Sequence, residues 1–184
     1  MYTTPAQLYK WWHATSPNMS VSTMERGQSC SQSLLTLSPV RRIDYEAGLQ
    51  EVCLPENCNV GLLPYSPLAG GVLSGKYSKA DASDEAAAKW RLNLFTGYMA
   101  RYKQSLAAEA VELYSDLAKK YDMTPSEFAI AFCNSRDFVT STIIGATSVP
   151  QLRENIGAFD KVWTPEMEED VDQVFKKYKD PSKM

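Results

Sequence analysis

The stretch from Val60 to Tyr77 brings together residue types that suit the binding of a phosphate. A short apolar run of strand length breaks into prolines and the pair Gly70-Gly71, and Lys76 follows. Adjacent glycines let main-chain amides approach a ligand closely because no Cβ stands in the way. A lysine supplies a point charge that suits a phosphate, although a lysine in a loop can equally be a solvated one.

A buried parallel strand is the element that would position these groups. The apolar run before Pro64 predicts such a strand, and α/β enzymes bind ligands in the loops at the carboxyl ends of parallel strands. A second junction of this kind is expected downstream. The residues Phe138 to Ile144 predict a strand, and Ser148-Val-Pro-Gln151 is a capping box that marks the start of a helix. Unpaired amides and the positive end of the helix dipole there suit a phosphate, whereas an ordinary capped helix is the alternative.

Helices are expected between and around these two junctions. Asp44 predicts a helix cap for Tyr45 to Cys53, and Tyr98 to Tyr121 has an apolar stripe at helical spacing. A capping box with proline at the first position opens a further helix at Thr124, and a last helix runs from Thr164 to about Lys179. Strands alternating with helices predict parallel α/β units.

Two motifs carry a resemblance to a known family. The run Tyr65-Ser-Pro-Leu-Ala-Gly-Gly-Val-Leu-Ser-Gly-Lys-Tyr77 resembles the seventh-strand loop of the aldo-keto reductases, and Ser141 to Ala158 resembles their eighth strand and the following helix. The resemblance extends from about Arg42 to about Val174. It implies an α/β fold, a partial (β/α)8 TIM barrel of roughly the last three strand–helix units, because a whole barrel typically takes ~250 residues and this chain has 184.

The resemblance also implies a cofactor and the residues that would hold it. The cofactor is NADP(H), with NAD(H) not excluded. Tyr65 would stack on the nicotinamide, and Ser66 with the backbone from Leu68 to Gly71 would hold the pyrophosphate. The adenosine half would lie at the second junction. The expected cofactor-binding residues are Tyr65, Ser66, Pro67, Leu68, Gly70, Ser74, Lys76, Tyr77, Gly145, Thr147, Gln151, Glu154 and Asn155.

Selectivity for the 2′-phosphate depends on one position. Many members of the family supply a cation here, but this chain has Gln151 where an arginine often lies, and Arg153 is the nearest cation. A single charge-assisted bond of ~1.5–3 kcal/mol would separate NADPH from NADH by roughly one or two decades in affinity. The choice between the two cofactors therefore stays open at this point.

The catalytic set of the family is not found in this sequence. A tyrosine donates the proton in that family, with a lysine–aspartate pair tuning its pKa and a histidine nearby. No strand end here carries Asp-x-x-x-x-Tyr, and His13 is best interpreted as a surface helix residue. We expect no catalytic residue and no metal ligand in this chain, which would be inactive in carbonyl reduction by itself.

Two segments are expected along the chain. Residues 1–40 form a divergent segment with a helix starting at Thr4-Pro5 and a weak strand at Met19 to Met24. This segment is a divergent loop or the product of a frame shift or a mis-joined exon. Residues 41–184 correspond to the C-terminal half of an aldo-keto reductase domain.

Composition excludes several classes of partner. The net charge of −3 indicates neither nucleic acid nor an anionic membrane. No apolar run reaches the ~20 residues of a membrane span, and no secretory signal is found. The four cysteines have no metal or redox spacing, so reduced thiols in the cytoplasm are expected. The expected partners are a small-molecule carbonyl substrate and a missing N-terminal half-barrel.

Three functions are consistent with these patterns. The first is a fragment of an aldo-keto reductase that contributes the cofactor-binding loops. The second is a pseudoenzyme or cofactor-sensing module, like the potassium-channel β subunits that share the same loop motifs. The third is a product of faulty gene annotation with no stable fold, because a few parallel strands alone leave a sheet edge uncovered.

Overall fold

The computed structural model describes residues 33–36, 39, 42–43, 45–54, 56–57, 61–79, 85–95, 97, 100–103, 105–179 and 181. The chain divides into two compact units, residues 1–30 and 31–184, and every described residue belongs to the second. The helix expected at Thr4-Pro5, the strand at Met19–Met24 and His13 therefore lie outside the described residues.

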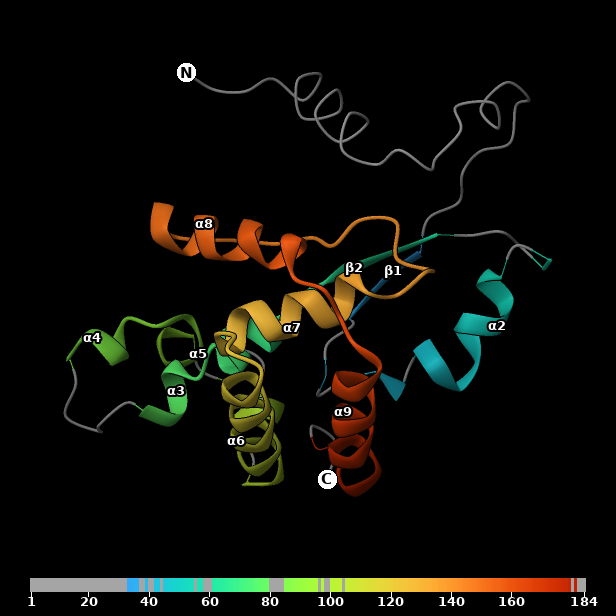
Figure 1. The fold of residues 1–184 in the computed structure, drawn as a ribbon. Coiled ribbons are helices and arrows are strands. Elements are labelled where there is room, and N and C mark those ends of the chain that lie inside the picture. Colours follow the sequence, from blue (N-terminus) through green and yellow to red (C-terminus); the bar gives the residue numbers. More distant parts are fainter. Residues whose placement is uncertain are drawn as a thin grey trace, which may run out of the picture. The chain divides into compact units, whose positions relative to one another are not determined.

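Two short strands form a parallel pair (Figure 1). Strand β1 is Ser33–Thr36 and strand β2 is Leu62–Tyr65, in a register that pairs Ser33 with Leu62 and Thr36 with Tyr65. The strand expected from the apolar run before Pro64 is confirmed. Strand β1 was not predicted.

A third segment runs parallel to β2, but it is not the continuous strand that the sequence predicts for Phe138–Ile144. Isolated bridges join Val139 to Leu62 and Ile143 to Tyr65. The amide of Leu62 donates to the Phe138 carbonyl at 2.9 Å, and the carbonyl of Leu62 accepts from Thr140 at 2.8 Å.

The pairing changes opposite Pro64 of β2, because the three steps along the chain from Leu62 to Tyr65 lie opposite four steps from Val139 to Ile143. Backbone bonds of a strand alternate between its two neighbours, so Pro64 faces the same segment as Leu62. The Pro64 carbonyl accepts from the amide of Ile143 at 2.8 Å, but proline has no N–H to donate in return. The ladder therefore lacks one bond at this position.

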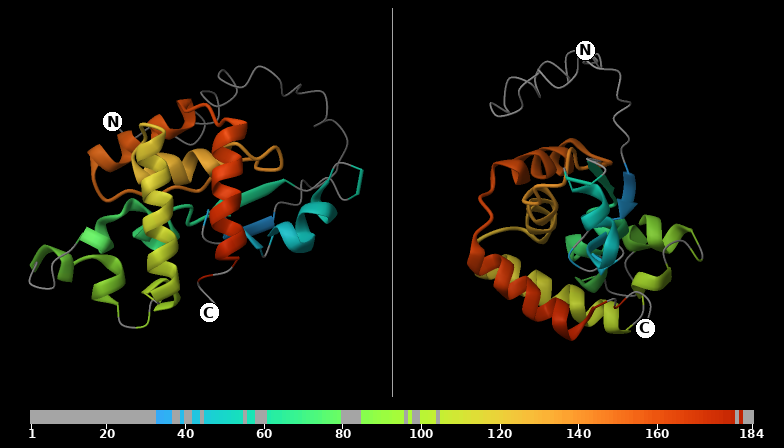
Figure 2. Two further views of the ribbon diagram at one scale, coloured as in Figure 1. Left: turned by 60° about the horizontal axis from the view of Figure 1, so that its bottom comes forward. Right: turned by 90° about the vertical axis from the view of Figure 1, so that its right-hand side faces the viewer.

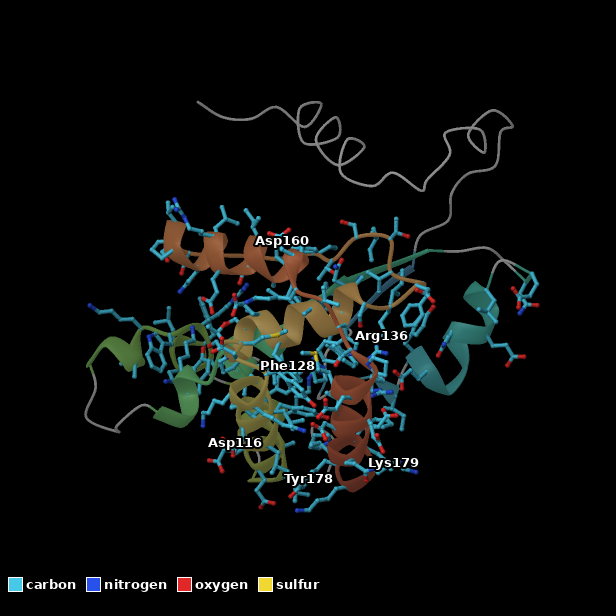
Figure 3. All side chains as sticks on the ribbon, viewed as in Figure 1. Asp116, Phe128, Arg136, Asp160, Tyr178 and Lys179 are labelled. Carbon is cyan, nitrogen blue, oxygen red and sulfur yellow. The ribbon has the colours of Figure 1, made fainter. Side chains whose placement is uncertain are left out.

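Four longer helices surround the described core (Figures 1 and 2). They are α6 (Ser105–Lys120), α7 (Pro125–Asn134), α8 (Val149–Gly157, continued by the 3₁₀ turn η5, Ala158–Asp160) and α9 (Pro165–Lys177). Helix α7 contacts both α6 and α8, and α6 lies beside α9. Figure 3 shows Phe128 of α7 among packed side chains and Asp116 on the outside of α6.

Local signals in the sequence position these helices correctly. The apolar stripe of α6 is buried as expected, with Ala107, Ala110, Val111, Tyr114 and Ala118 at most 3% exposed. The capping box of α7 is complete, because Thr124 accepts from the Glu127 amide while the Glu127 carboxylate accepts from the Thr124 amide. Thr164 caps α9, which ends at Lys177 rather than at Lys179.

The helix expected over Tyr45–Cys53 forms in two parts. Residues Tyr45–Leu49 are a π-helix, η2, and Gln50–Cys53 are the α-helix α2. Arg42, just before η2, fastens this region to α9, because its guanidinium bonds Glu46 at 2.7 Å and Asp172 at 2.8 Å.

Short helices occupy most of the described chain between β2 and α6. They are η3 (Ala69–Ser74), α3 (Lys76–Lys79), α4 (Glu85–Ala88), α5 (Arg91–Leu94) and η4 (Ala100–Lys103). Leu92 of α5 is 1% exposed and anchors this part of the chain.

The described residues thus contain three parallel segments, two of them strands, within a mostly helical arrangement. These ranges do not make a closed barrel. In the same part of the chain, no helix combines the length and the apolarity that crossing a bilayer requires.

Candidate functional site

The two junctions singled out in the sequence lie at the same edge of the parallel segments. Tyr65, the last residue of β2, is bridged to Ile143, and both segments run in the same direction. The loops that continue from them, at Ser66 and at Gly145, therefore leave from neighbouring carboxyl ends. This geometry suits one ligand that contacts both loops. Tyr65 is 41% exposed there, so its ring is accessible.

The loop after β2 folds tightly on itself. Ser66, Ala69, Gly70 and Gly71 all have positive φ angles, 58°, 49°, 71° and 93°. Ser66 and Ala69 are not glycines, so a backbone with positive φ costs energy at these two residues. Backbone strain of this kind clusters at functional sites. Pro67 and Ala69 are buried, so the loop is held by packing as well as by hydrogen bonds.

The amides of Ala69, Gly70 and Gly71 donate hydrogen bonds within the loop, so the expectation that the Leu68–Gly71 backbone holds a pyrophosphate stays a prediction. The Ala69 amide donates to the Ser66 carbonyl at 2.8 Å, and the Gly70 amide donates to Ser66 Oγ at 3.1 Å. The Gly71 amide donates to the Leu68 carbonyl at 2.8 Å. In the tight turn that the glycines permit, these three amides already donate to acceptors of the loop itself.

Lys76 folds back over the glycines and takes the place of those amides as the candidate phosphate ligand. A Cβ added to Gly71 would lie 3.4 Å from Lys76 Cε and 3.6 Å from Nζ, so the end of the lysine side chain lies beside this glycine. No carboxylate of the described residues forms an ion pair with Lys76. Burial lowers the pKa of Lys76, because it penalises the charged form.

Ser74 and Tyr77, expected to close over the cofactor, bond within the protein. Ser74 Oγ donates to the Gly71 carbonyl at 2.7 Å. The hydroxyl of Tyr77 accepts from the Leu92 amide at 3.3 Å, which ties α3 to α5. These two residues support the loop that carries Lys76.

A residue that sequence reasoning missed completes this cluster. The ring of Trp90 meets the ring of Tyr77 edge-on, with centroids 5.4 Å apart. Lys76 Nζ lies 5.1 Å from the Tyr77 ring centre and 5.4 Å from that of Trp90. No motif described above pointed to Trp90.

The second junction is shaped by its own side chains. Asn155 is 3% exposed, and its Nδ2 donates to the Gly145 carbonyl at 3.3 Å. Ser148 caps α8 as expected, accepting from the Gln151 amide. The capping box is incomplete, however, because the Gln151 side chain accepts from the amide and hydroxyl of Thr147, at 3.0 and 2.9 Å, instead of from Ser148.

Glu154, expected to bind the adenosine half, is engaged elsewhere. Its carboxylate accepts a hydrogen bond of 2.6 Å from the hydroxyl of Thr124, the cap residue of α7. The same threonine caps α7, so Glu154 links the middle of α8 to the start of α7. Gln151 and Thr147 are exposed at the start of α8 and are the residues best placed to meet a ligand there.

Some of the residues expected to bind a dinucleotide are positioned to contact one, and others bond within the protein. Lys76 and the Ser66 hydroxyl could hold phosphate oxygens, the Tyr65 ring offers a stacking face, and Thr147 with Gln151 could meet an adenosine group. The buried Cys133 of α7 is not a candidate nucleophile, because burial raises the pKa of its thiol to about 12. No group of three or more metal-ligating side chains lies together in the described ranges.

The sequence is similar to known proteins over most of its length. The model of the "Aldo/keto reductase family" matches residues 23–176, further toward the N-terminus than the motifs above. An "Aldo-keto reductase" of Babesia bovis is 39% identical over 76% of this chain and 49% of its own length. "Protein tas" of Escherichia coli is 34% identical over 75% of this chain and 38% of its own.

A third relative has a different name. A "Probable voltage-gated potassium channel subunit beta" of Arabidopsis thaliana is 36% identical over 64% of this chain and 36% of its own length. The chain thus spans between about a third and a half of the curated relatives it matches.

Proposed function

Because this chain belongs to the aldo/keto reductase family, we propose that it forms the cofactor-binding part of an oxidoreductase that acts on a small aldehyde or ketone. The proposed cofactor is NADP(H), with NAD(H) as the alternative; when bound, it supplies or takes up the hydride. The supporting observation is that the segments leading to Lys76, the first residue of α3, and to the start of α8 leave adjacent carboxyl ends.

The chain's own residues bind and orient in this proposal. Lys76 and the hydroxyl of Ser66 hold the phosphates, and the exposed ring of Tyr65 supports the nicotinamide. Thr147 and Gln151 contact the adenosine half at the positive end of α8. We place this protein in the cytoplasm, as its cysteine usage suggests.

A first half-barrel, on the same or another polypeptide, supplies the proton donor in this proposal. Support comes from an exposed apolar face of α8 and η5 whose members recur at helical spacing, 37–71% exposed: Val149, Leu152, Ile156 and Phe159. The family fold has eight strand–helix units, and the chain spans 36–49% of the relatives reported above. The first half is therefore the occupant we assign to this face.

Titration of the full chain with NADPH, followed by the fluorescence of the reduced nicotinamide, tests the proposal. We expect saturable binding and no carbonyl reduction by the chain alone. Adding a separately expressed first half of a relative should restore reduction of a simple aldehyde. Failure of both NADPH and NADH to bind contradicts the proposal, and turnover by the chain alone contradicts the predicted need for a first half.

The potassium-channel relative supports a second candidate, a cofactor-sensing module without turnover. Both candidates predict binding by the chain alone. They differ when the first half is present, because the sensing module would still bind the cofactor but reduce no aldehyde.

Cofactor selectivity gives a further prediction. Gln151 is exposed at the start of α8, and its side-chain oxygen Oε1 accepts hydrogen bonds from Thr147. We expect Gln151→Arg to raise the preference for NADPH over NADH about tenfold or more, because a charge-assisted bond contributes ~1.5–3 kcal/mol. The dissociation constants of both cofactors provide the measurement. Arg153→Gln is the control, because it removes the nearest natural cation. If this variant lost the preference for NADPH over NADH, Arg153 would be the cation that binds the 2′-phosphate.

A further inference from the structure

Lys76 is held by aromatic rings rather than by a carboxylate. Its Nζ lies 5.1 Å from the Tyr77 ring centre and 5.4 Å from the Trp90 ring centre, and the two rings meet at 86°. A cation beside the face of an aromatic ring is attracted by the ring quadrupole, most strongly for tryptophan. Such contacts fix the position of the charge without neutralising it, which leaves it able to bind an anion.

Trp90 is itself fixed by the backbone around it. Its amide donates to the Ala87 carbonyl at 3.1 Å, and its carbonyl accepts from Asn93 and Leu94 at 2.8 Å. The Leu92 amide next to it bonds the Tyr77 hydroxyl. These bonds hold the Trp90 backbone, and the edge-on contact with Tyr77 packs against its ring, which reaches Lys76 from fourteen positions away in the sequence, counted from 76 to 90.

We infer that Trp90 is a positioning residue: it holds Lys76 Nζ over Gly71, where the ammonium group binds a phosphate of the cofactor. The inference rests on the proposed function. A freely rotating lysine would lose side-chain entropy on binding the phosphate, whereas one already held in place loses less of it. Trp90 touches Lys76 and not the reacting atoms.

Three measurements test this inference on the full chain. NADPH titration measures cofactor binding, and titration with inorganic pyrophosphate measures anion binding at Lys76 without the rest of the dinucleotide. Lysines carrying ¹³C-methyl groups report the environment of Lys76 by NMR without any ligand, because nearby rings displace its resonance upfield. Lys76→Met identifies that resonance by its disappearance.

We expect Trp90→Leu to weaken both ligands about two- to fivefold, as the loss of one cation–π contact predicts, and to move the Lys76 resonance downfield. Trp90→Phe, which keeps a ring, should recover most of the affinity. In the Lys76→Met background, Trp90→Leu should have no further effect on binding. Leu94→Ala is the matched control, since Leu94 lies in α5, the short helix that follows Trp90, and is 58% exposed.

The outcomes separate the two proposals. If Trp90→Leu leaves both the affinity and the Lys76 resonance unchanged, the positioning role is overturned. The proposed function still stands in that case, provided that the wild type binds NADPH. An equal loss in the Lys76→Met background also overturns the positioning role, because Trp90 would then act independently of Lys76. Binding of pyrophosphate that depends on Trp90, without binding of NADPH or NADH, overturns the proposed function and keeps the lysine site.

Discussion

Lys76→Met is expected to weaken NADPH binding about 10- to 100-fold while changing the free energy of unfolding by less than about 0.5 kcal/mol. A hydrogen bond to a charged group contributes ~1.5–3 kcal/mol, and every 1.4 kcal/mol is tenfold in affinity. Lys76 forms no ion pair with the described carboxylates, so its removal leaves no buried charge behind. Fluorescence titration and urea unfolding measure the two quantities.

Lys89→Met is the matched control for Lys76→Met. It removes the same charge from an exposed position in the turn after α4, so it corrects for the general attraction between a cationic surface and an anionic ligand. Equal losses of affinity in the two variants would contradict a specific role for Lys76. The lowered pKa of Lys76 adds a second readout: binding should decline with rising pH earlier than it would for an exposed lysine.

Arg42→Met is expected to lower the free energy of unfolding by about 3 kcal/mol. Arg42 is 8% exposed, and its guanidinium bonds Glu46 at 2.7 Å and Asp172 at 2.8 Å while lying 4.4 Å from the Phe175 ring centre. Removing one partner of a buried ion pair costs ~3–5 kcal/mol because the other charges stay behind. The carboxylates are 22–38% exposed, which favours the lower end of that range.

The pKa of Arg42 agrees with this interpretation. Burial opposes the charged form, but the hydrogen bonds and charges of Glu46 and Asp172 outweigh it and raise the pKa. Arg42 therefore stays charged at every working pH. Methionine keeps an unbranched apolar side chain at this position and removes the charge. Urea unfolding followed by circular dichroism gives the free-energy difference.

Lys119→Met is the matched control for Arg42→Met. Lys119 also forms an ion pair, with Asp116 at 2.7 Å, but both side chains are 67% exposed. Exposed pairs contribute ~0–1 kcal/mol, so this variant should unfold almost like the wild type. If Arg42→Met lost no more stability than Lys119→Met, the network around Arg42 would not stabilise the fold.

The sequence by itself determined those features that depend on neighbouring residues. The capping box at Thr124, the buried stripe of α6 and the cap at Thr164 all formed as predicted, because each is set by side chains three or four positions apart. The family resemblance, drawn from two loops, was confirmed by a match over residues 23–176.

Only the tertiary structure decided the contacts between distant segments. The strand expected at Phe138–Ile144 is interrupted opposite Pro64, and Thr124 bonds Glu154 across 30 positions. Trp90 reaches Lys76 because α5 packs back on the loop after β2. Contacts between residues far apart in the sequence form only when the chain folds back and buries both partners. No local pattern in the sequence shows which of the many possible pairs will meet.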